Sequence, residues 1–263
     1  MICVPGIKLN GVASVDASGL EITAASLNAA TKCLDGCPRA NVGAIIVATF
    51  SNPSRFPALS IRIVSRLRLP SSTIAFDLNL ACSAYPYAVY LASHIAHDLG
   101  KDVLVVDGDI QSPLVDKDDY STGSIFSDAF TATLVSAHDD FTSRFDFLSK
   151  ESDALVCPSA GPIKMNGFEV FSFVATEVSE FLRAFGSDFD IFAPHQANPY
   201  MVRQLAKSLS LYDKLVRIDE SRLNPGSCSV PLALEANWKS GATALIAGFG
   251  AGYSASAGIV RLG

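Results

Sequence analysis

The 263-residue sequence lacks a long apolar run, a Cys-x-x-Cys pair and an excess of positive charge. Apolar runs such as 43–49 and 103–106 are far shorter than the roughly 20 residues that a membrane-spanning helix requires, so we expect no membrane span. The formal net charge is −6, and Lys and Arg are scattered except at 62–68, which argues against nucleic acid as a partner. Six cysteines without paired spacing argue for reduced thiols and against a metal site.

Charged residues are also scarce, at 17% of the chain, whereas 49% of the residues are apolar. This composition excludes a disordered chain and predicts a folded protein. The first residues, Met-Ile-Cys-Val-Pro-Gly, lack the basic segment and the apolar stretch of about 7–15 residues that are typical of a secretory signal. We therefore expect a cytoplasmic protein.

Apolar, strand-like runs alternate with helix-like segments, which predicts an α/β fold. Helices are expected at 21–34, with Asp16 and Ser18 as capping residues, and at 167–185. The polar stretch 137–165 predicts a surface loop or flap. The expected strands are 43–49, 73–78, 103–107, 132–136, 190–194, 215–219, 243–248 and 257–262.

The two sets of four strands have similar spacing, which favours a duplicated unit with a site between the halves. The alternative is a chance likeness, since many α/β chains can be divided into similar halves.

Cys82 follows an expected strand directly and stands at the start of an expected helix, within Phe-Asp-Leu-Asn-Leu-Ala-Cys-Ser-Ala-Tyr. Unpaired backbone N–H groups and the helix dipole favour a thiolate at such a position, so we expect a lowered thiol pKa and a nucleophile. The structural alternative is a small buried apolar residue.

Three further positions also follow expected strands. His195 opens Pro-His-Gln-Ala-Asn at a strand end, where α/β proteins build their sites, although a buried histidine with a purely structural role is the alternative. Asn224 begins Asn-Pro-Gly, which is also a strong turn sequence. The glycine-rich corner 248–252 does not match a phosphate loop, but its N–H groups are able to bind a developing oxyanion.

The order of these features resembles the β-ketoacyl-ACP synthase III branch of the thiolase superfamily. Five motifs carry the resemblance: Ala-Cys-Ser-Ala-Tyr at 81–85, Met-Asn-Gly-Phe-Glu-Val-Phe at 165–171, Pro-His-Gln-Ala-Asn at 194–198, Asn-Pro-Gly-Ser-Cys-Ser-Val-Pro-Leu-Ala-Leu at 224–234 and Gly-Phe-Gly-Ala-Gly at 248–252. The resemblance implies an α/β thiolase fold, five-layered α/β/α/β/α, with two duplicated halves. Residues 1–140 would form the half with the nucleophile and 141–263 the half with the histidine and asparagine. Such proteins usually form homodimers, and a heterodimer with another ketosynthase is the alternative.

By motif position, Cys82 is the acyl-accepting nucleophile and His195 and Asn224 are its catalytic partners. The resemblance also implies that the N–H groups of Cys82 and Ala251 form the oxyanion hole. The implied reaction transfers an acyl group from a thioester to Cys82 and then condenses it with a malonyl thioester as CO₂ is lost. Two alternatives are an acyltransferase that acylates an alcohol or amine without decarboxylation, and a non-catalytic partner subunit of a heteromeric ketosynthase.

Other positions of the family match residues for substrate binding. Gly167 and Asn198 match positions near the pantetheine tunnel. Phe56 matches a phenylalanine that crosses the dimer to shape the acyl pocket, and a large apolar wall residue is the alternative. No metal or cofactor is implied.

The chain departs from the family at its N-terminus. Residues 5–9 align after the family's opening strand and after the segment that clamps the CoA nucleotide, so we expect neither feature here. Acyl carrier protein is therefore favoured over acyl-CoA as the donor. Arg203 and Lys207, on an expected helix after His195, are candidates to meet the acidic carrier.

Overall fold

Eight strands form one mixed sheet in the structure, a computed structural model that describes residues 1–217, 219–221 and 223–263. Along the sheet the strands follow the order β3-β2-β4-β5-β1-β10-β9-β8, and β6 and β7 form a separate hairpin. The bounds are β1 (Ile2–Asp16), β2 (Val42–Ala48), β3 (Ile74–Leu78), β4 (Asp102–Asp109), β5 (Ala129–Ser149), β6 (Leu155–Val156), β7 (Lys164–Met165), β8 (Ile191–Pro194), β9 (Thr243–Gly250) and β10 (Ser254–Leu262).

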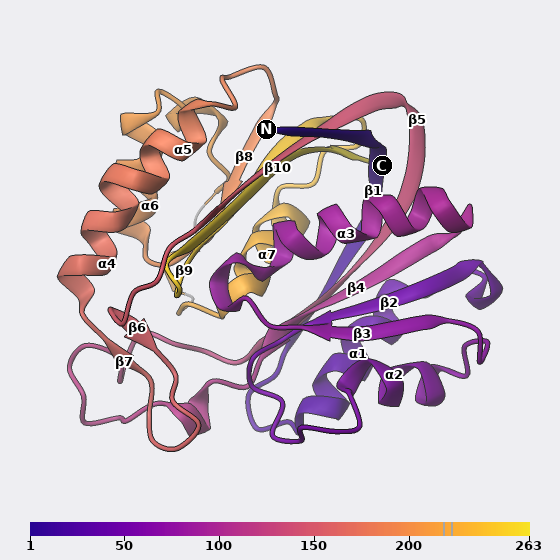
Figure 1. The fold of residues 1–263 in the computed structure, drawn as a ribbon, viewed down its shortest axis with the longest axis horizontal. Helices are drawn as coiled ribbons and strands as arrows, with labels where there is room; N and C mark the ends of the chain where they lie inside the picture. The colour runs from indigo at the N-terminus through magenta and orange to yellow at the C-terminus, as the bar shows by residue number, and fades with distance from the viewer. Residues whose placement is uncertain (218, 222) are drawn as a thin grey trace.

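The helices cover this sheet in layers. They are α1 (Ile22–Cys33), α2 (Leu59–Leu67), α3 (Ala84–Leu99), α4 (Gly167–Phe173), α5 (Ser179–Arg183), α6 (Pro199–Ser208) and α7 (Ser229–Ala236). A π-helical turn at Val174–Val178 joins α4 to α5. Figure 1 shows α1 and α2 on one outer side, α3 and α7 in the middle, and α4 to α6 on the other outer side. The expected α/β fold with five layers is confirmed.

Strand β2 shows why its sequence is apolar throughout. All seven of its residues are buried. Ile46 packs into the middle apolar cluster with α3 and α7, whereas Ile45 and Val47 pack into an outer cluster with α1 and α2. A strand that is covered by helices on both faces needs apolar side chains on both, so its sequence is a continuous apolar run.

Strand β1 is not among the strands expected from the sequence. It lies inside the sheet, antiparallel to β5 and parallel to β10. Irregularities between Pro5 and Ile7 and between Leu9 and Val12 interrupt its pairing. These breaks, together with Pro5 and Gly6, hide the alternation of apolar and polar residues by which a strand is recognised in a sequence.

Three local expectations also need correction. Residues 137–149 are not a loop, because β5 continues to Ser149 and pairs there with β10. Glu21 caps α1 by accepting the N–H groups of Thr23 and Ala24, whereas Asp16 accepts a hydrogen bond from Ser18 instead. The strand expected at 215–219 is reduced to an isolated bridge between Leu215 and Phe192, and residue 218 lies outside the described residues.

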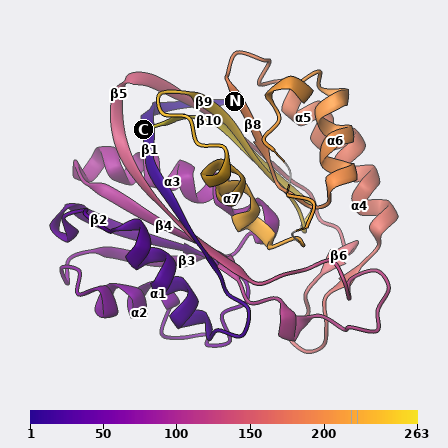
Figure 2. The ribbon, with the colours of Figure 1, turned by 180° about the vertical axis from the view of Figure 1, so that it is seen from behind.

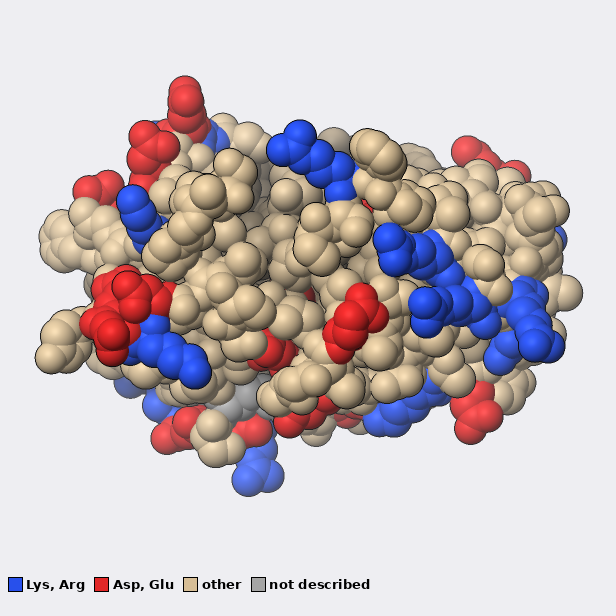
Figure 3. Space-filling view, turned by 90° about the horizontal axis from the view of Figure 1, so that it is seen from below, with Lys and Arg blue, Asp and Glu red and all other residues tan. Residues whose placement is uncertain are grey.

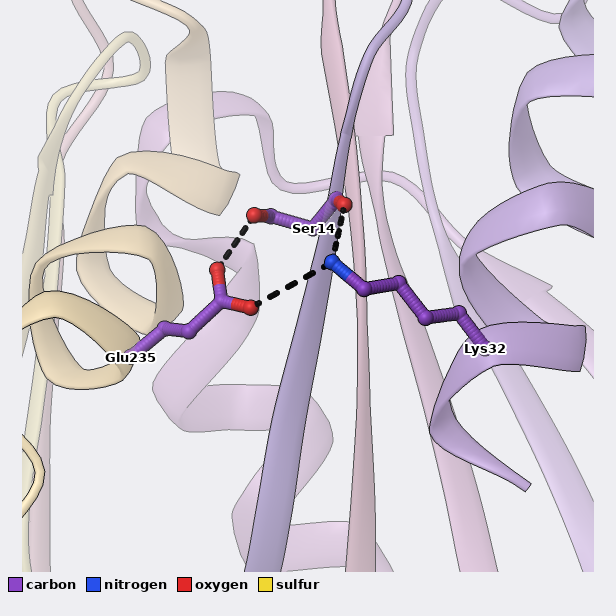
Figure 4. Close-up of polar contacts among 3 residues, drawn as sticks. All are labelled: Ser14, Lys32 and Glu235. Atoms are coloured by element: carbon purple, nitrogen blue, oxygen red, sulfur yellow. Dashed lines mark hydrogen bonds and ion pairs between the residues drawn. The ribbon is translucent and has the colours of Figure 1, made fainter. Parts of the chain in front are cut away.

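Strand β1 lies between helices from distant parts of the chain and contacts both. Figure 2 shows β1 running between α1 and α7. There the Ser14 hydroxyl donates to Glu235 of α7, while Lys32 of α1 donates to the Ser14 carbonyl and lies 3.8 Å from the other Glu235 oxygen (Figure 4). The boundary expected at residue 140 falls within β5, and the division into two halves stays a prediction.

The surface carries its charges unevenly. Seen from below, basic side chains gather at the end of the molecule that holds α2, the helix that contains Arg62 and Arg66, whereas acidic and basic side chains are mixed at the opposite end (Figure 3). None of the helices that the structure describes combines the length and the apolar character that a membrane span requires.

Candidate active site

Cys82 lies in a tight turn between a strand and a helix. Strand β3 ends at Leu78, a 3₁₀ turn covers Ala81–Ser83, and α3 begins at Ala84. Ala81 has φ +42°, in the left-handed region that favours glycine, so the turn holds the residue before Cys82 in a strained conformation. The Cys82 side chain is buried, with 7% of its surface exposed.

Two glycines of β9 allow this turn to approach the sheet. A Cβ atom on Gly248 would lie 2.7 Å from the Cys82 carbonyl oxygen. A Cβ atom on Gly250 would lie 3.0 Å from Cys82 Cβ and 3.3 Å from its Sγ. The glycine-rich corner therefore gives room to the cysteine rather than to a phosphate.

The thiol does not have the lowered pKa expected from its place before a helix. Burial, and secondarily the charge of Asp109, raise the pKa of Cys82 to about 12. The backbone N–H groups of Cys82 and Ala251 act in the opposite direction, because they stabilise the thiolate. Desolvation outweighs these N–H groups, so the free site holds a neutral thiol at pH 7.

His195 lies directly after β8, and three contacts fix its ring and backbone. Its backbone N–H donates to the Ala247 carbonyl at 2.7 Å, and its Nδ1 lies 2.7 Å from Ser229 Oγ. Its ring packs nearly perpendicular to the Phe249 ring, with 5.5 Å between the ring centroids. Burial lowers the pKa of His195 to about 4, although the Gly226 backbone favours the protonated ring. The imidazole is therefore neutral at pH 7.

Asn224 lies in the loop before α7, and its backbone forms hydrogen bonds with the distant segment 125–127. Its N–H donates to the Ile125 carbonyl at 2.8 Å, and its carbonyl accepts the Ser127 N–H at 2.9 Å. Its Oδ1 accepts the Gly226 N–H at 2.8 Å. The side-chain oxygen is thus occupied, which leaves the amide N–H groups for a ligand.

A cavity of about 430 Å³ brings the three predicted catalytic residues together. Cys82, His195 and Asn224 all line it. Gly167 and Asn198 line the same cavity, and the Asn198 side chain also caps α6 by accepting the Met201 N–H at 2.8 Å. Apolar side chains complete the walls, among them Ile125, Phe126, Leu155, Met165, Val170, Val174 and Phe249. We call this space the front cavity.

A second cavity, of about 630 Å³, also reaches Cys82. Ala251 lines it, as do Phe126 and Leu155, which both cavities share. Phe56 lines neither cavity of its own chain and is 85% exposed. Cys82 therefore lines both cavities.

The expected carrier contacts have partners within the chain. Arg203 forms an ion pair with Glu220, which lines the front cavity. Lys207 lies over the Tyr212 ring, 5.6 Å from its centroid. Both are on α6, beside the cavity that Pro199 and Met201 of the same helix line.

Sequence reasoning missed residues that support the catalytic three. Ser229 contacts His195, and Gln111 donates to the Asn224 carbonyl at 3.2 Å. Asp109 accepts hydrogen bonds from Thr49 and from the N–H groups of residues 50 and 51, and its pKa is raised to about 6 by burial. Gln111 and Asp109 belong to none of the five motifs, and the motif at 224–234 contains Ser229 without indicating its contact with His195, so only the fold reveals these contacts.

None of the six cysteines, all of which lie among the described residues, forms a disulfide. Within the described part of the chain, no group of three or more His, Cys, Asp or Glu side chains is arranged to hold a metal ion.

Comparison with known protein families gives two matches. The model of 3-oxoacyl-[acyl-carrier-protein (ACP)] synthase III matches residues 76–153. The model of the C-terminal part of the same enzyme matches residues 185–262. The first match includes Cys82, and the second includes His195 and Asn224.

Curated relatives agree with these models. A β-ketoacyl-[acyl-carrier-protein] synthase III of Coxiella burnetii (strain RSA 493 / Nine Mile phase I) is 30% identical over 269 residues, covering 91% of this chain and 83% of the relative. One from Sphingopyxis alaskensis is 29% identical, covering 98% of this chain and 88% of the relative.

Solved structures share the fold. A 3-oxoacyl-(acyl carrier protein) synthase III from Pseudomonas aeruginosa PAO1 superposes with a TM-score of 0.90 at 24% identity, covering 98% of each chain. The priming β-ketosynthase of the R1128 polyketide pathway gives a TM-score of 0.89 at 23% identity, covering 100% of this chain and 98% of the other.

Proposed function

This chain belongs to the 3-oxoacyl-[acyl-carrier-protein] synthase III family, and we propose that Cys82, His195 and Asn224 perform its two half-reactions. The chain is a β-ketoacyl synthase, a condensing enzyme of fatty-acid or polyketide synthesis. The convergence of these three side chains on one cavity carries the proposal for their roles. The non-condensing acyltransferase and the non-catalytic subunit are not favoured.

In the first half-reaction, Cys82 Sγ attacks the carbonyl carbon of an acyl thioester. The carbonyl oxygen becomes negative and accepts the N–H groups of Cys82 and Ala251, which already stabilise the thiolate. The C–S bond to the carrier breaks, and the carrier leaves as a thiol with the proton that Cys82 gave up. The acyl group then remains on Cys82 as a thioester.

In the second half-reaction, a malonyl thioester occupies the front cavity. Its thioester carbonyl accepts hydrogen bonds from His195 and from the free amide N–H of Asn224. These donors stabilise the enolate that forms as the carboxylate leaves as CO₂. The enolate carbon attacks the acyl-Cys82 carbonyl, a C–C bond forms, and Cys82 leaves as thiolate with a β-ketoacyl thioester as product.

Acyl carrier protein is the proposed carrier of both thioesters. Its pantetheine arm requires only a tunnel to the nucleophile, and the front cavity extends from Cys82 to Tyr120 and Glu220. Tyr120 is fully exposed, so this end of the cavity lies at the surface. Arg203 and Lys207 lie on the helix beside it and would face an acidic carrier.

A homodimer is the proposed assembly. Strand β3 is an edge strand and begins with Ile74, which is 43% exposed. Phe56 is 85% exposed, although large apolar side chains are normally covered. A second copy paired along β3 would cover this edge and bring its Phe56 toward the cavities. A cytoplasmic location stays a prediction from the sequence.

Intact-protein mass spectrometry tests the first half-reaction. The protein and a Cys82→Ala variant are incubated with a panel of acyl-ACP and acyl-CoA thioesters. We expect one acyl adduct on the protein, none on the variant, and loss of the adduct when malonyl-ACP is added. Absence of an adduct from every donor, or an adduct that persists in the variant, would contradict the role of Cys82.

A further inference from the structure

Ser229 is the first residue of α7 and lies behind the catalytic histidine. The residue is 1% exposed. Its Oγ lies 2.7 Å from His195 Nδ1 and accepts the Gln196 N–H at 3.0 Å. We propose that Ser229 is a positioning residue that holds His195 in the tautomer with its proton on Nε2.

The hydrogen-bonding capacity of the Ser229 hydroxyl determines which ring nitrogen of His195 carries the proton. A serine hydroxyl has one proton to donate, and a buried hydroxyl donates it wherever an acceptor is available. Among the described residues, His195 Nδ1 is the acceptor that the Ser229 hydroxyl reaches. Because the ring is neutral at pH 7, its single proton then lies on Nε2.

The tautomer has a consequence for the second half-reaction, and this step rests on the proposed function. His195 lines the front cavity, whereas Ser229 does not. Nδ1 points to Ser229, and the proposal therefore assigns the Nε2–H group to the cavity side of the ring, with the Asn224 amide. Two N–H donors then meet one thioester carbonyl. The opposite tautomer would present a bare Nε2 lone pair to that oxygen and repel the developing enolate.

The space beyond Ser229 makes a matched pair of variants possible. A separate cavity of about 270 Å³ is lined by Ser229, Gln196 and Pro225, and by the Ser14 and Glu235 side chains shown in Figure 4. This rear cavity gives room for one extra methyl group next to Ser229. Ser229→Thr therefore keeps the hydroxyl, whereas Ser229→Ala removes it.

Nuclear magnetic resonance tests the tautomer directly in the unaltered protein. The chain has four histidines, so ¹⁵N labelling of the imidazole rings gives few signals, and His195→Gln identifies the signals of His195. We expect a protonated Nε2 and an unprotonated Nδ1 at pH 7. A protonated Nδ1 would overturn the proposal, and this result does not depend on any variant folding.

A kinetic comparison tests the consequence. Acylation of Cys82 and decarboxylation of malonyl-ACP are measured separately for Ser229→Ala, Ser229→Thr and, as a remote control, Ser26→Ala. Ser26 is equally buried and donates to the Ile22 carbonyl on α1. We expect Ser229→Ala to keep acylation and to lose about 10- to 100-fold in decarboxylation, as when the outer partner of a functional histidine is removed. Ser229→Thr should recover most of the lost decarboxylation rate, and Ser26→Ala should change neither acylation nor decarboxylation.

The outcomes separate this proposal from the proposed function. If Ser229→Ala lowers both steps equally, or if Ser229→Thr fails as Ser229→Ala does, Ser229 is only structural. Unchanged decarboxylation in Ser229→Ala would also overturn the proposal. If the unaltered protein forms no acyl-Cys82, the proposed function fails, while the tautomer measured by NMR stands by itself.

Discussion

The ionisation of Cys82 is set by two opposing influences on a single buried side chain. Burial and the charge of Asp109 disfavour the thiolate, while the N–H groups of Cys82 and Ala251 favour it. In the proposed reaction, the same N–H groups bind the oxygen of the attacked thioester. The site is therefore arranged to stabilise charge during the reaction more than in the resting enzyme.

The reactivity of Cys82 toward iodoacetamide should depend steeply on pH. With a thiol pKa of about 12, the thiolate fraction rises about tenfold for each pH unit throughout the range from 7 to 10. We expect the alkylation rate of the peptide containing Cys82 to rise without a plateau in this range. The exposed Cys3, followed by mass spectrometry in the same samples, provides an internal comparison. A plateau near pH 7 would show a lowered pKa instead.

Asp107 is a second buried ionisable residue with a testable effect. It is 1% exposed, and burial, followed by the charge of Asp109, raises its pKa well above 3.8, although a hydrogen bond with Ser227 acts in the opposite direction. The folded state therefore binds this proton more tightly than the unfolded state, so its favourable contribution is present below pH 3.8 and is lost as the pH rises through the raised pKa.

Asp107→Asn cannot ionise, so it should gain stability relative to the unaltered protein between pH 5 and pH 8. The expected gain is about 1–3 kcal/mol, measured by urea unfolding at both pH values. Asp128→Asn is the contrasting variant, because Asp128 accepts hydrogen bonds from Gln111 and Ser112 and its replacement should destabilise at both pH values. No relative gain for Asp107→Asn at pH 8 would contradict this assignment.

At the scale of elements, β9 and the turn before α3 form one unit. Gly248 and Gly250 alternate along β9, and side chains at both positions would meet Cys82. Two glycines on one face of a strand lower its stability, because they add backbone entropy and offer no side chain to pack. The two glycines are explained by the close approach of the turn that contains Cys82.

Gly250→Ala should prevent acylation of Cys82, whereas it should lower the stability of the fold only moderately. Gly250 has φ +155°, so alanine there costs about 1–3 kcal/mol, and its Cβ would also lie 3.3 Å from Cys82 Sγ. Gly241→Ala is the matched control, since Gly241 has φ +78° and its added Cβ would meet no atom within 4 Å. We expect both variants to lower the melting temperature by several degrees, and Gly250→Ala alone to lose acyl adduct formation. Equal acylation in the two variants would contradict the role given to the contact.

The sequence predicts those elements whose signal is local. Strand β2 is predicted because its sequence is a continuous apolar run, and the structure shows that both of its faces are buried. Strand β1 was missed because two irregularities break its pattern, and the end of β5 because its side chains at Asp139 and Asp140 are polar and exposed.

At the site, the motifs predict Cys82, His195 and Asn224. The contact between Ser229 and His195 joins two motifs through the fold and leaves no pattern in the sequence.

At the scale of the whole molecule, the sheet has two different edges. The edge strand β8 lies beside the extended segment at Leu215, whose bridge to Phe192 covers part of it. The edge strand β3 pairs only on its β2 side among the described residues. An open edge with an exposed Ile74 favours pairing with a second copy.

Ile74→Lys should weaken the homodimer, because a lysine on the edge places a charge where the copies would meet. Ile61→Lys is the matched control, since Ile61 is 50% exposed on α2 and does not belong to the sheet edge. We expect light scattering to give a dimer for the unaltered protein and for Ile61→Lys, and a larger monomer fraction for Ile74→Lys. A monomeric unaltered protein with full activity would contradict the proposed assembly.

A single-turnover condensation tests the central claim most directly, namely that this chain joins an acyl group on Cys82 to a decarboxylated malonyl unit. Acyl-Cys82 enzyme, freed of excess donor, is mixed with malonyl-ACP that carries ¹³C at C2 of the malonyl group. The account predicts one CO₂ released for each acyl group lost, and a β-ketoacyl-ACP with the label between its two carbonyl carbons. Loss of the acyl group to water or to another acceptor, without labelled β-ketoacyl product, would contradict it.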